Sequence, residues 1–427
     1  MSRKRKPPQP PARLTLRDLA MHAEVSRATV SLVLRNSPLV AEKTREKVRA
    51  SMAALGYVYN RGAANFRTQR TPPVGLAMNE LVNPHFSELT ASVERALAKV
   101  GRTVFLSNSS ENPAVQDSFI ASMREYNVEG LIICPTQGSS PKALRRLTEF
   151  GPPCVLISRN VPGSGLDYAG NDHRRGMRLA TEHLISLGHR RIAMVGANDR
   201  ISTGIERREG YEQALAAHGI AGEPGLVRHG PPTRSFGAEA VKSLLDLAEK
   251  PTGCVCFNDV IAFGVMLGLR QLGLEPGRDF AVVGCDDLAE AGLWTPALTT
   301  VAVDTIGMGE AAARLLIERS GDFGRPRRQI VLQPKLIVRA SSGPARQRRS
   351  RQSHLAEAGL WTPALTTVSV ATIGMGEAAA RLLIERSNDF GRPRRQIVLQ
   401  PKLIVRASSG PARQRRSRQS NLVVAAP

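Results

Sequence analysis

Apolar residues recur at two different spacings along the chain, and the change falls near residue 72. Before it, the apolar positions follow a helical period. After it, short apolar runs alternate with longer amphipathic stretches. The runs predict strands at residues 74–78, 103–107, 130–134, 154–158, 191–196, 253–257 and 280–284, and the stretches predict helices at 86–100, 113–126, 174–187, 207–218, 236–249 and 260–272. Such alternation is typical of parallel sheets with helices on both faces.

Residues 72–342 are too many for one sheet of modest size, so the pattern favours two α/β lobes with a cleft between them. The predicted fold is therefore a small all-α head followed by an α/β core of two parallel-sheet lobes. Polar residues that follow the strands of such sheets face the cleft, where ligands bind.

The first sixty residues predict three short helices. Thr15 and Asp18 form a helix-start signal, Ser26 can cap a second helix at 27–35, and a third runs over residues 41–55 before Gly56. Three helices with a tight turn between the first two are typical of a helix-turn-helix. The alternative is an ordinary helical subdomain with solvated charges.

The chain carries a long internal repeat. Residues 288–353, the first copy, and residues 355–420, the second copy, differ only at Ala302/Ser369, Asp304/Ala371 and Gly321/Asn388. Architectural repeats diverge in sequence, so near-identity indicates a recent tandem duplication. The second copy lacks the residues that precede the first, but it is expected to contain the same helix (374–387) and strands (396–399 and 403–405) as the first copy. We expect the second copy to be an appendage that does not pack into the core. The alternative is that it competes with the first copy for the same position in the core.

The chain has 427 residues and a formal net charge of +22, from 59 Lys+Arg against 37 Asp+Glu. Residues 1–70 hold 15 basic and 4 acidic residues, and the second copy holds 11 and 4. Such an excess favours a polyanionic partner, most often nucleic acid. The arginine-rich ends of both copies, at residues 346–351 and 413–418, are expected to add nonspecific DNA affinity.

Several classes are disfavoured. No apolar run reaches the length of a membrane span, and no apolar stretch follows the basic N-terminus as in a secretory signal. Five scattered cysteines predict reduced thiols and a cytoplasmic location. Cys254 and Cys256 are interpreted as core residues rather than half of a metal site, and no cofactor or metal is expected. Because no catalytic motif stands out, an enzyme of sugar metabolism is a weak third hypothesis.

Residues in the head match a known family. Its pattern includes Val25-Ser26, Thr29-Val30-Ser31, the run from Thr44 to Val48 and Gly56-Tyr57 with Asn60. These residues closely resemble the DNA-binding domain of the LacI/GalR (lactose-repressor) family of bacterial transcription regulators. The resemblance implies a recognition helix that begins at Arg27, with Arg27 and Ala28 on the base-reading positions. Leu32 stands where several members carry Arg, and Glu24 stands where the turn usually has Gly.

The family also has a hinge helix, which aligns with residues 60–66. In the family it orders on DNA, where paired hinges wedge an apolar residue into the minor groove. Phe66 occupies that position, and the alternative is a linker Phe packed on the core. The resemblance thus implies a set of DNA contacts: Thr15, Ser26, Arg27, Ala28, Thr29, Ser31, Leu32, Asn36, Asn60, Arg61, Ala63 and Phe66.

Family motifs continue in the core, including residues 171–173, 183–193, 207–215, 257–259 and 283–287. The family's core is similar to periplasmic sugar-binding proteins. The resemblance implies that Arg207, Asn258 and Asp286 bond an effector, with Asn83, His85 and Phe86 forming a wall of its site. The alternatives are that Asn258 and Asp286 only cap helices and that Arg207 is a surface residue in a first helical turn. Residues 231–232 lack the aromatic that some members stack on their effector.

We therefore expect a cytoplasmic bacterial homodimer, associated with the nucleoid, that binds a pseudo-palindromic DNA operator, with a small carbohydrate-like effector modulating its affinity. It is expected to be a repressor rather than an enzyme, and no membrane is expected among its partners. The alternative is a solute-binding component of a transport system. The expected organisation is a basic arm (1–13), a helix-turn-helix domain (14–59), a hinge (60–71), a two-lobed effector-binding and dimerisation core (72–342) and a duplicated segment (343–427).

Overall fold

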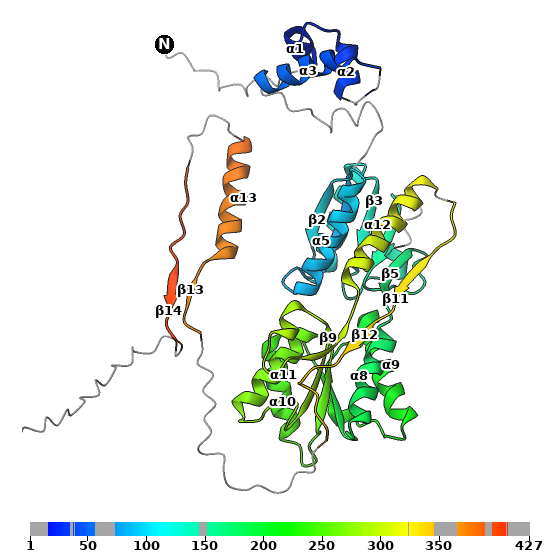
Figure 1. The fold of residues 1–427 in the computed structure, drawn as a ribbon, viewed down its shortest axis with the longest axis vertical. Coiled ribbons are helices and arrows are strands. Elements are labelled where there is room, and N and C mark those ends of the chain that lie inside the picture. Colours follow the sequence, from blue (N-terminus) through cyan, green and yellow to red (C-terminus); the bar gives the residue numbers. More distant parts are fainter. Residues whose placement is uncertain are drawn as a thin grey trace, which may run out of the picture. The chain divides into compact units, whose positions relative to one another are not determined.

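The computed structural model describes residues 16–34, 37, 39–55, 73–144, 152–322, 324–345, 365–388, 395–406 and 408 (Figure 1). They form a helical head, a two-lobed core and a C-terminal segment. The predicted basic arm and hinge lie outside these residues, as do the predicted DNA contacts at positions 15, 36, 60, 61, 63 and 66.

The head consists of α1 (Leu16–His22), α2 (Arg27–Leu34) and α3 (Glu42–Leu55). Apolar residues from all three helices bury one another, with Leu19, Val30 and Val48 fully enclosed. In the turn between α1 and α2, Glu24 takes a φ of 47°, a left-handed conformation that favours glycine. Its carboxylate binds Lys47 of α3 at 2.7 Å, so the residue at this unusual position also ties the turn to the third helix.

The amino-terminal lobe is a six-stranded sheet in the order β11-β5-β4-β3-β1-β2, and every neighbouring pair is parallel. Alternate side chains of its strands face α5 and α12 on one side and α6 on the other. The elements are β1 (Val74–Met78), α5 (Pro84–Lys99), β2 (Val104–Asn108), α6 (Pro113–Glu125), β3 (Gly130–Ile133), β4 (Cys154–Ile157), β5 (Asp167–Asn171), α12 (Thr305–Gly321) and β11 (Gln329–Leu332).

The carboxy-terminal lobe is a second six-stranded sheet, in the order β12-β10-β9-β8-β6-β7, parallel except for β12. Helices α10 and α11 cover one face, and α8 and α9 cover the other. The elements are α8 (His173–Ser186), β6 (Ile192–Ala197), α9 (Ser202–Ala217), β7 (Val227–His229), α10 (Arg234–Leu245), β8 (Gly253–Cys256), α11 (Asp259–Gln271), β9 (Ala281–Asp286), β10 (Thr299–Ala302) and β12 (Lys335–Ile337). Short 3₁₀ turns lie at Pro224–Leu226 and Ala289–Gly292.

Two parallel-sheet lobes confirm the predicted fold class, and all seven predicted strands form. Helix α9 was predicted to begin at residue 207 but begins at Ser202. The prediction missed its first turn because the residues there are mostly small and polar and form no apolar stripe. Strands β5, β7 and β10 were not predicted. Strand β5 holds a polar Asp167-Tyr-Ala-Gly-Asn171 run that is nevertheless buried, since it lies inside the sheet.

The C-terminal segment contains β13 (Thr367–Ser369), α13 (Thr372–Asn388) and β14 (Lys402–Ile404). The predicted helix of the second copy forms. The strand predicted at residues 396–399 does not form. Its equivalent in the first copy, β11, is a strand because it pairs with β5 of the core, and the described residues of the segment offer no such edge.

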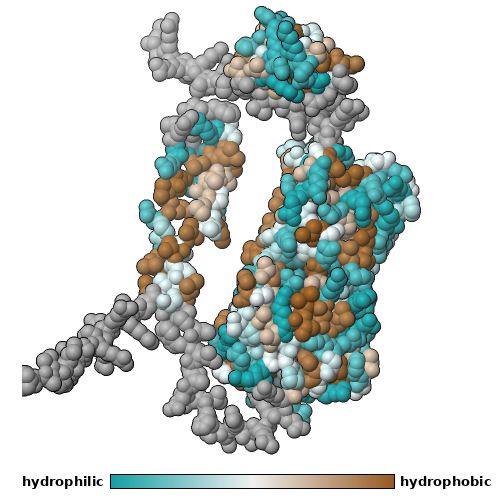
Figure 2. Space-filling model, viewed as in Figure 1, coloured by the Kyte–Doolittle hydropathy of each residue, from teal (hydrophilic) through white to brown (hydrophobic). Residues whose placement is uncertain are grey.

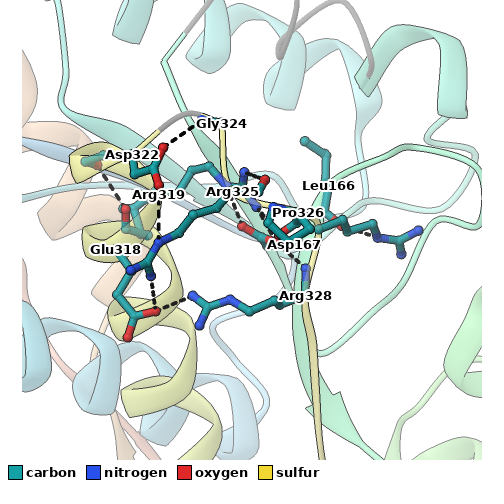
Figure 3. Close-up of polar contacts among 12 residues, drawn as sticks. Leu166, Asp167, Glu318, Arg319, Asp322, Gly324, Arg325, Pro326 and Arg328 are labelled. Atoms are coloured by element: carbon teal, nitrogen blue, oxygen red, sulfur yellow. Dashed lines mark hydrogen bonds and ion pairs between the residues drawn. The ribbon is translucent and has the colours of Figure 1, made fainter.

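One buried ion pair anchors α12 to the amino-terminal sheet. Both carboxylate oxygens of Asp167 accept bonds from the Arg319 guanidinium, at 2.8 and 2.9 Å, and the backbone N–H of Arg328 adds a third bond at 2.7 Å (Figure 3). The Asp167 side chain is 1 % exposed. A buried charge with several partners is costly to disturb, because removing one partner leaves the other desolvated and uncompensated.

We therefore expect Asp167→Asn to lower the free energy of unfolding by about 3 kcal/mol, measured by urea denaturation followed by circular dichroism. Asp322→Asn is the matched control, since Asp322 pairs with Arg325 at 3.7 Å but its side chain is 60 % exposed. Its effect should stay within about 0.5 kcal/mol. Equal effects of the two substitutions would show that the buried pair does not anchor α12.

Candidate functional site

A cavity of about 620 Å³ is lined by residues of both lobes of the core. Parallel strands direct the residues that follow them to one edge of each sheet. Here Asn79 follows β1, Ser158 follows β4, Phe257 follows β8 and Asp286 ends β9. All six effector contacts predicted from the sequence line this cavity, namely Asn83, His85, Phe86, Arg207, Asn258 and Asp286.

Arg207 is the central cation on the side of the carboxy-terminal lobe. Because α9 begins at Ser202, Arg207 lies in its second turn, and the residue is only 5 % exposed. This burial contradicts the alternative of a surface residue in a first turn. The guanidinium lies 4.2 Å above the centre of the Phe257 ring, and its Nη2 is 3.5 Å from Oδ1 of Asp286. Its Nε is buried and makes no hydrogen bond, so it remains available to a ligand acceptor.

Asn258 and Asp286 differ in how they are used locally. The Oδ1 atom of Asn258 accepts a bond from the backbone N–H of Ile261 at 3.0 Å, so this residue caps α11 as well as lining the cavity. Asp286 caps no helix: it has a φ of 120° at the end of β9, and the turn after it has Leu288 as its cap. Burial raises the pKa of Asp286 to about 7, although Arg207 partly opposes the shift.

Asp259 makes the electrostatics of this corner unusual. Its buried carboxylate accepts bonds from the hydroxyl of Thr300 at 2.6 Å and from the N–H of Leu288 at 2.8 Å. Burial, and then the charge of Asp286, raise the pKa of Asp259 to about 7. Two neighbouring carboxyl groups are thus poised between their neutral and ionised forms near neutral pH.

Asn83, His85 and Phe86 come from the start of α5. Asn83 caps the helix by accepting a bond from the N–H of His85 at 3.1 Å. The rings of His85 and Phe86 meet edge to face at 5.1 Å. Burial, followed by the charge of Arg207, lowers the pKa of His85 to about 4, so this ring is neutral at physiological pH. It presents an uncharged polar edge beside an apolar ring.

A second charged pair, which was not predicted from the sequence, lies on the side of the amino-terminal lobe. The guanidinium of Arg159 donates to both carboxylate oxygens of Glu111, at 2.9 and 2.7 Å, and to the carbonyl of Pro135. The amide of Asn79 donates to the same carboxylate at 2.8 Å. Arg159 directly follows the predicted strand 154–158, so the rule that ligand residues follow strands could have found it. Glu111 lies in a loop and has no such signal.

His173 is a further lining residue. It is 6 % exposed and begins α8, immediately after the chain passes from one lobe to the other. Burial, and then the charge of Arg207, hold the pKa of its ring well below the usual range. Residues 171–173 belong to the family pattern, but no role was predicted for the His173 ring. The cavity therefore has two neutral histidines between two charged pairs.

In the head, the start of α2 is exposed. Ser26, Arg27 and Ala28 are open to solvent, and Thr29, Ser31 and Leu32 are partly buried. The Ser26 hydroxyl accepts a bond from the N–H of Thr29 at 3.0 Å and so caps the helix. Leu32 packs against the apolar core of the head. Several family members carry an arginine at this position. The packing of Leu32 against the core is consistent with a structural role here.

The described residues show no metal site, because no group of three or more His, Cys, Asp or Glu side chains converges among them. Cys254 and Cys256 lie in one apolar cluster, as predicted. Among the same residues no helix is long and apolar enough to cross a membrane.

An exposed helix-turn-helix, joined in one chain to two lobes that enclose a polar cavity, defines a DNA-binding regulator with a ligand-binding core. Comparison with known families agrees. A family of bacterial regulatory proteins, the lacI family, matches residues 15–60, and the periplasmic binding protein-like domain matches residues 181–342 and 352–409.

Whole-length relatives support the same assignment. The regulator GalR of Escherichia coli is 33 % identical over 77 % of this chain and 95 % of its own length. MalR of Streptomyces coelicolor is 33 % identical over 79 % and 98 %. Among solved structures, the lac repressor dimer bound to operator and an anti-inducer aligns with a TM-score of 0.71 at 27 % identity, over 79 % of this chain and 99 % of that one. A cellobiose complex of the regulator CelR aligns with a TM-score of 0.60 at 32 % identity, over 77 % and 100 %.

The chain belongs to the lacI family and is a DNA-binding transcriptional regulator with an effector-binding core. This finding favours the regulator over the solute-binding transport component that the core alone would allow.

The raised pKa of Asp259 gives a prediction for pH dependence. In the unfolded chain its pKa is near ~3.9, so between about pH 4 and pH 7 the folded protein holds a proton that the unfolded chain releases. Its contribution to stability is therefore largest at low pH and falls as pH rises through 7. Asp259→Asn should reduce the loss of unfolding free energy between pH 5 and pH 8 by about 2 kcal/mol, measured by urea denaturation.

Thr300→Val serves as the comparison. It removes the hydroxyl that bonds the Asp259 carboxylate but keeps the ionisable group. It should destabilise the protein at both pH values and leave the pH dependence in place. If Asp259→Asn shows the same pH dependence as the unaltered chain, Asp259 is not the titrating group.

Proposed function

We propose that the protein is a homodimeric repressor that binds a neutral, polyhydroxylated effector, a mono- or disaccharide or a close derivative, in the cavity between its lobes. The observation that carries the choice of ligand is the pairing of charges. Arg207 is matched by Asp286 and Arg159 by Glu111, so each of the two buried arginines of the cavity is paired with a carboxylate and offers charge-assisted hydrogen bonds. Arg200 also lines the cavity, but it is exposed to solvent.

The size and the walls of the cavity support the same ligand class. A volume of about 620 Å³ is within the range of small-molecule sites. The rings of Phe86 and Phe257 supply apolar faces, and the neutral histidines supply polar edges. Related structures hold cellobiose, and ribose in a regulator from Enterococcus faecium. A ligand that bonds Arg159 and Arg207 at once would contact both lobes and favour one spacing between them.

Effector binding is proposed to act on DNA through this spacing. A ligand changes an equilibrium only if it binds the two states with different affinity, and a cavity shared by two lobes meets that requirement. In the dimer, altered lobe spacing would separate or disorder the paired hinges and weaken operator binding. The lac repressor relative was solved as a dimer on its operator. The protein would act in the cytoplasm, on the bacterial nucleoid.

The DNA contacts remain predictions from the family pattern. Arg27 and Ala28, exposed at the start of α2, are proposed to read base edges in the major groove, with Ser26, Thr29 and Ser31 near the backbone and Leu32 supporting the helix. Thr15, Asn36, Asn60, Arg61 and Ala63 are proposed to extend these contacts. Phe66 is proposed as the wedge in the minor groove, and it lies outside the described residues.

The function is tested by a DNA shift assay on the promoter region next to the gene, titrated with neutral sugars such as ribose and cellobiose and with a sugar phosphate. Neutral sugars should change the midpoint of the shift at lower concentration than the phosphate. Arg207→Ala should weaken the sugar effect by on the order of 10- to 100-fold, because it removes a buried charged donor. Arg178→Ala is the control: Arg178 is exposed on α8, pairs with Glu182 and does not line the cavity.

No shift at any salt concentration would overturn the regulator assignment itself. A shift that responds to the sugar phosphate and not to neutral sugars would contradict the proposed ligand class alone. Equal effects of Arg207→Ala and Arg178→Ala would remove Arg207 from the site.

Arg27→Ala should relax base preference at one position of each half-site, with a loss of roughly 10- to 100-fold on the preferred base. Selection of binding sites from a random DNA pool measures this. Arg49→Ala, at an exposed arginine of α3, is the control and should leave base preference unchanged. Unaltered preference in the Arg27 variant would exclude this residue from base reading.

A further inference from the structure

The second copy reproduces the internal structure that the first copy has in the core. Helices α12 and α13 both span 17 residues. Strand β13 pairs with β14 in the register that joins β10 to β12: Val368 lies opposite Leu403 as Val301 lies opposite Leu336. The segment therefore keeps the geometry of a piece of the core without contributing to either core sheet.

The same hydrogen bonds close both hairpins. The hydroxyl of Thr299 donates to the carbonyl of Arg339 at 2.9 Å, and that of Thr366 donates to the carbonyl of Arg406 at 2.8 Å. The N–H of Thr366 also donates to the Ser408 hydroxyl, as that of Thr299 does to Ser341. The second copy thus needs little rearrangement to adopt the shape of the first.

The two copies differ in burial. Leu316 is 1 % exposed and its equivalent Leu383 is 70 % exposed, and Val301 is 0 % exposed against 59 % for Val368. On the face of the segment that Figure 2 shows, apolar residues make up much of the coloured surface. The exposed apolar set is Leu365, Val368, Val370, Ile373, Met375, Leu383, Ile384, Ile397, Val398, Leu403 and Val405. Contiguous exposed apolar surface marks an interaction site.

We call the surface of the core that contacts the first copy the closure slot. Because the two copies are nearly identical, the same surface fits the exposed apolar side chains of the second copy. Ser92 of α5 donates to the carbonyl of Ile306 at 2.9 Å. Asp167 of β5 binds Arg319 (Figure 3). Further contacts are Asp259 with Thr300 at 2.6 Å and Asp287 with Arg339 at 2.8 Å. Every slot residue in these pairs precedes residue 288, so the slot does not depend on which copy fills it.

The second copy carries the same groups for each contact. Thr367, Ile373, Arg386 and Arg406 stand where the first copy has Thr300, Ile306, Arg319 and Arg339. The periplasmic binding protein-like domain matches residues 352–409 as well as 181–342. We propose that the second copy is an alternative occupant of the closure slot of its own core, so that the chain exchanges between two closures.

In the structure the first copy occupies the closure slot, and two features favour it over the second copy. The loop that leads to the slot is longer by one repeat of 67 residues for the second copy, which disfavours it by roughly 20-fold. Asp304 caps α12 by accepting a bond from Gly307 at 2.7 Å, and Ala371 has no such oxygen. An absent cap typically disfavours a helix by about fivefold. Together the two effects make the second closure a minor state of about one molecule in a hundred.

Cross-linking through cysteines detects the exchange. Lys99 of α5 lies 3.3 Å from Glu310 in the first copy, both exposed, and Glu377 is the equivalent residue in the second copy. Full-length chains with Lys99→Cys plus Glu310→Cys, or Lys99→Cys plus Glu377→Cys, are treated with a short bismaleimide. The five native cysteines are buried. The 99–377 link should form within single chains, at about one per cent of the rate of the 99–310 link.

Substitutions at the ion pair make the test selective. Arg319→Ala leaves Asp167 unpaired only while the first copy occupies the slot, and it should weaken that occupancy on the order of 100-fold. The 99–377 rate should then rise at least tenfold and match or exceed the 99–310 rate. Adding Arg386→Ala should bring it back down. Random collision of a tethered segment responds to neither change, so a 99–377 rate that ignores Arg319→Ala overturns the proposal, as do links that join only different chains.

A deletion keeps the proposal testable if Arg319→Ala prevents folding. Removing residues 288–354 joins Asp287 directly to Leu355, so the second copy takes the position of the first. The matched control removes residues 355–421. Both shortened chains should melt cooperatively, within a few degrees of each other, by circular dichroism. A cooperative melt in the control and none in the first deletion would overturn the proposal, because the second copy would then be unable to fill the slot.

Discussion

The structure depends on one segment that belongs to both lobes. The chain passes between the lobes three times, after β5, β10 and β11, and residues 299–337 make the last two of these passages. Within them, β10 and β12 complete one sheet while α12 and β11 complete the other. The buried pair of Arg319 with Asp167 fixes this segment in the amino-terminal lobe, and Thr300 with Asp259 fixes it in the other. The cleft is therefore held by a shared element rather than by a linker.

This arrangement explains why the pKa values of the histidines and carboxyl groups at the site are shifted. The lobes bring Arg207, Asp286 and His173 of the carboxy-terminal lobe close to His85 of the amino-terminal lobe, all of them buried. Burial favours neutral forms, so it lowers the pKa values of the histidines and raises those of Asp259 and Asp286. A ligand that displaces water and whose hydroxyl groups donate hydrogen bonds to Asp286 would stabilise the ionised carboxylate. Binding of such a ligand and deprotonation of this corner would then favour each other.

Sequence periodicity predicted the central strands and both lobes, because apolar strands buried on two faces read as continuous apolar runs. It missed β5, because this strand carries polar residues that are partnered by long-range contacts, such as Asp167 with Arg319, that no local pattern encodes. The cavity residues were found through family position and the rule that ligand groups follow strands. Glu111 escaped both, since a loop carboxylate becomes a site residue only through Arg159, 48 residues away. The DNA contacts on the hinge still rest on the resemblance alone.

The duplicated segment separates two properties that are usually inseparable in a protein sequence: the tendency of a segment to adopt a shape and the energy gained by burying it. Both copies have a 17-residue helix and a hairpin of the same register. Only the copy in the core has β11, because that strand needs β5 as its partner. Local sequence is therefore enough for the helix and the hairpin, whereas the last strand and the apolar core require the slot. Since the slot is a surface of residues that precede residue 288, the two copies compete for one source of burial energy, and loop length and a helix cap decide between them.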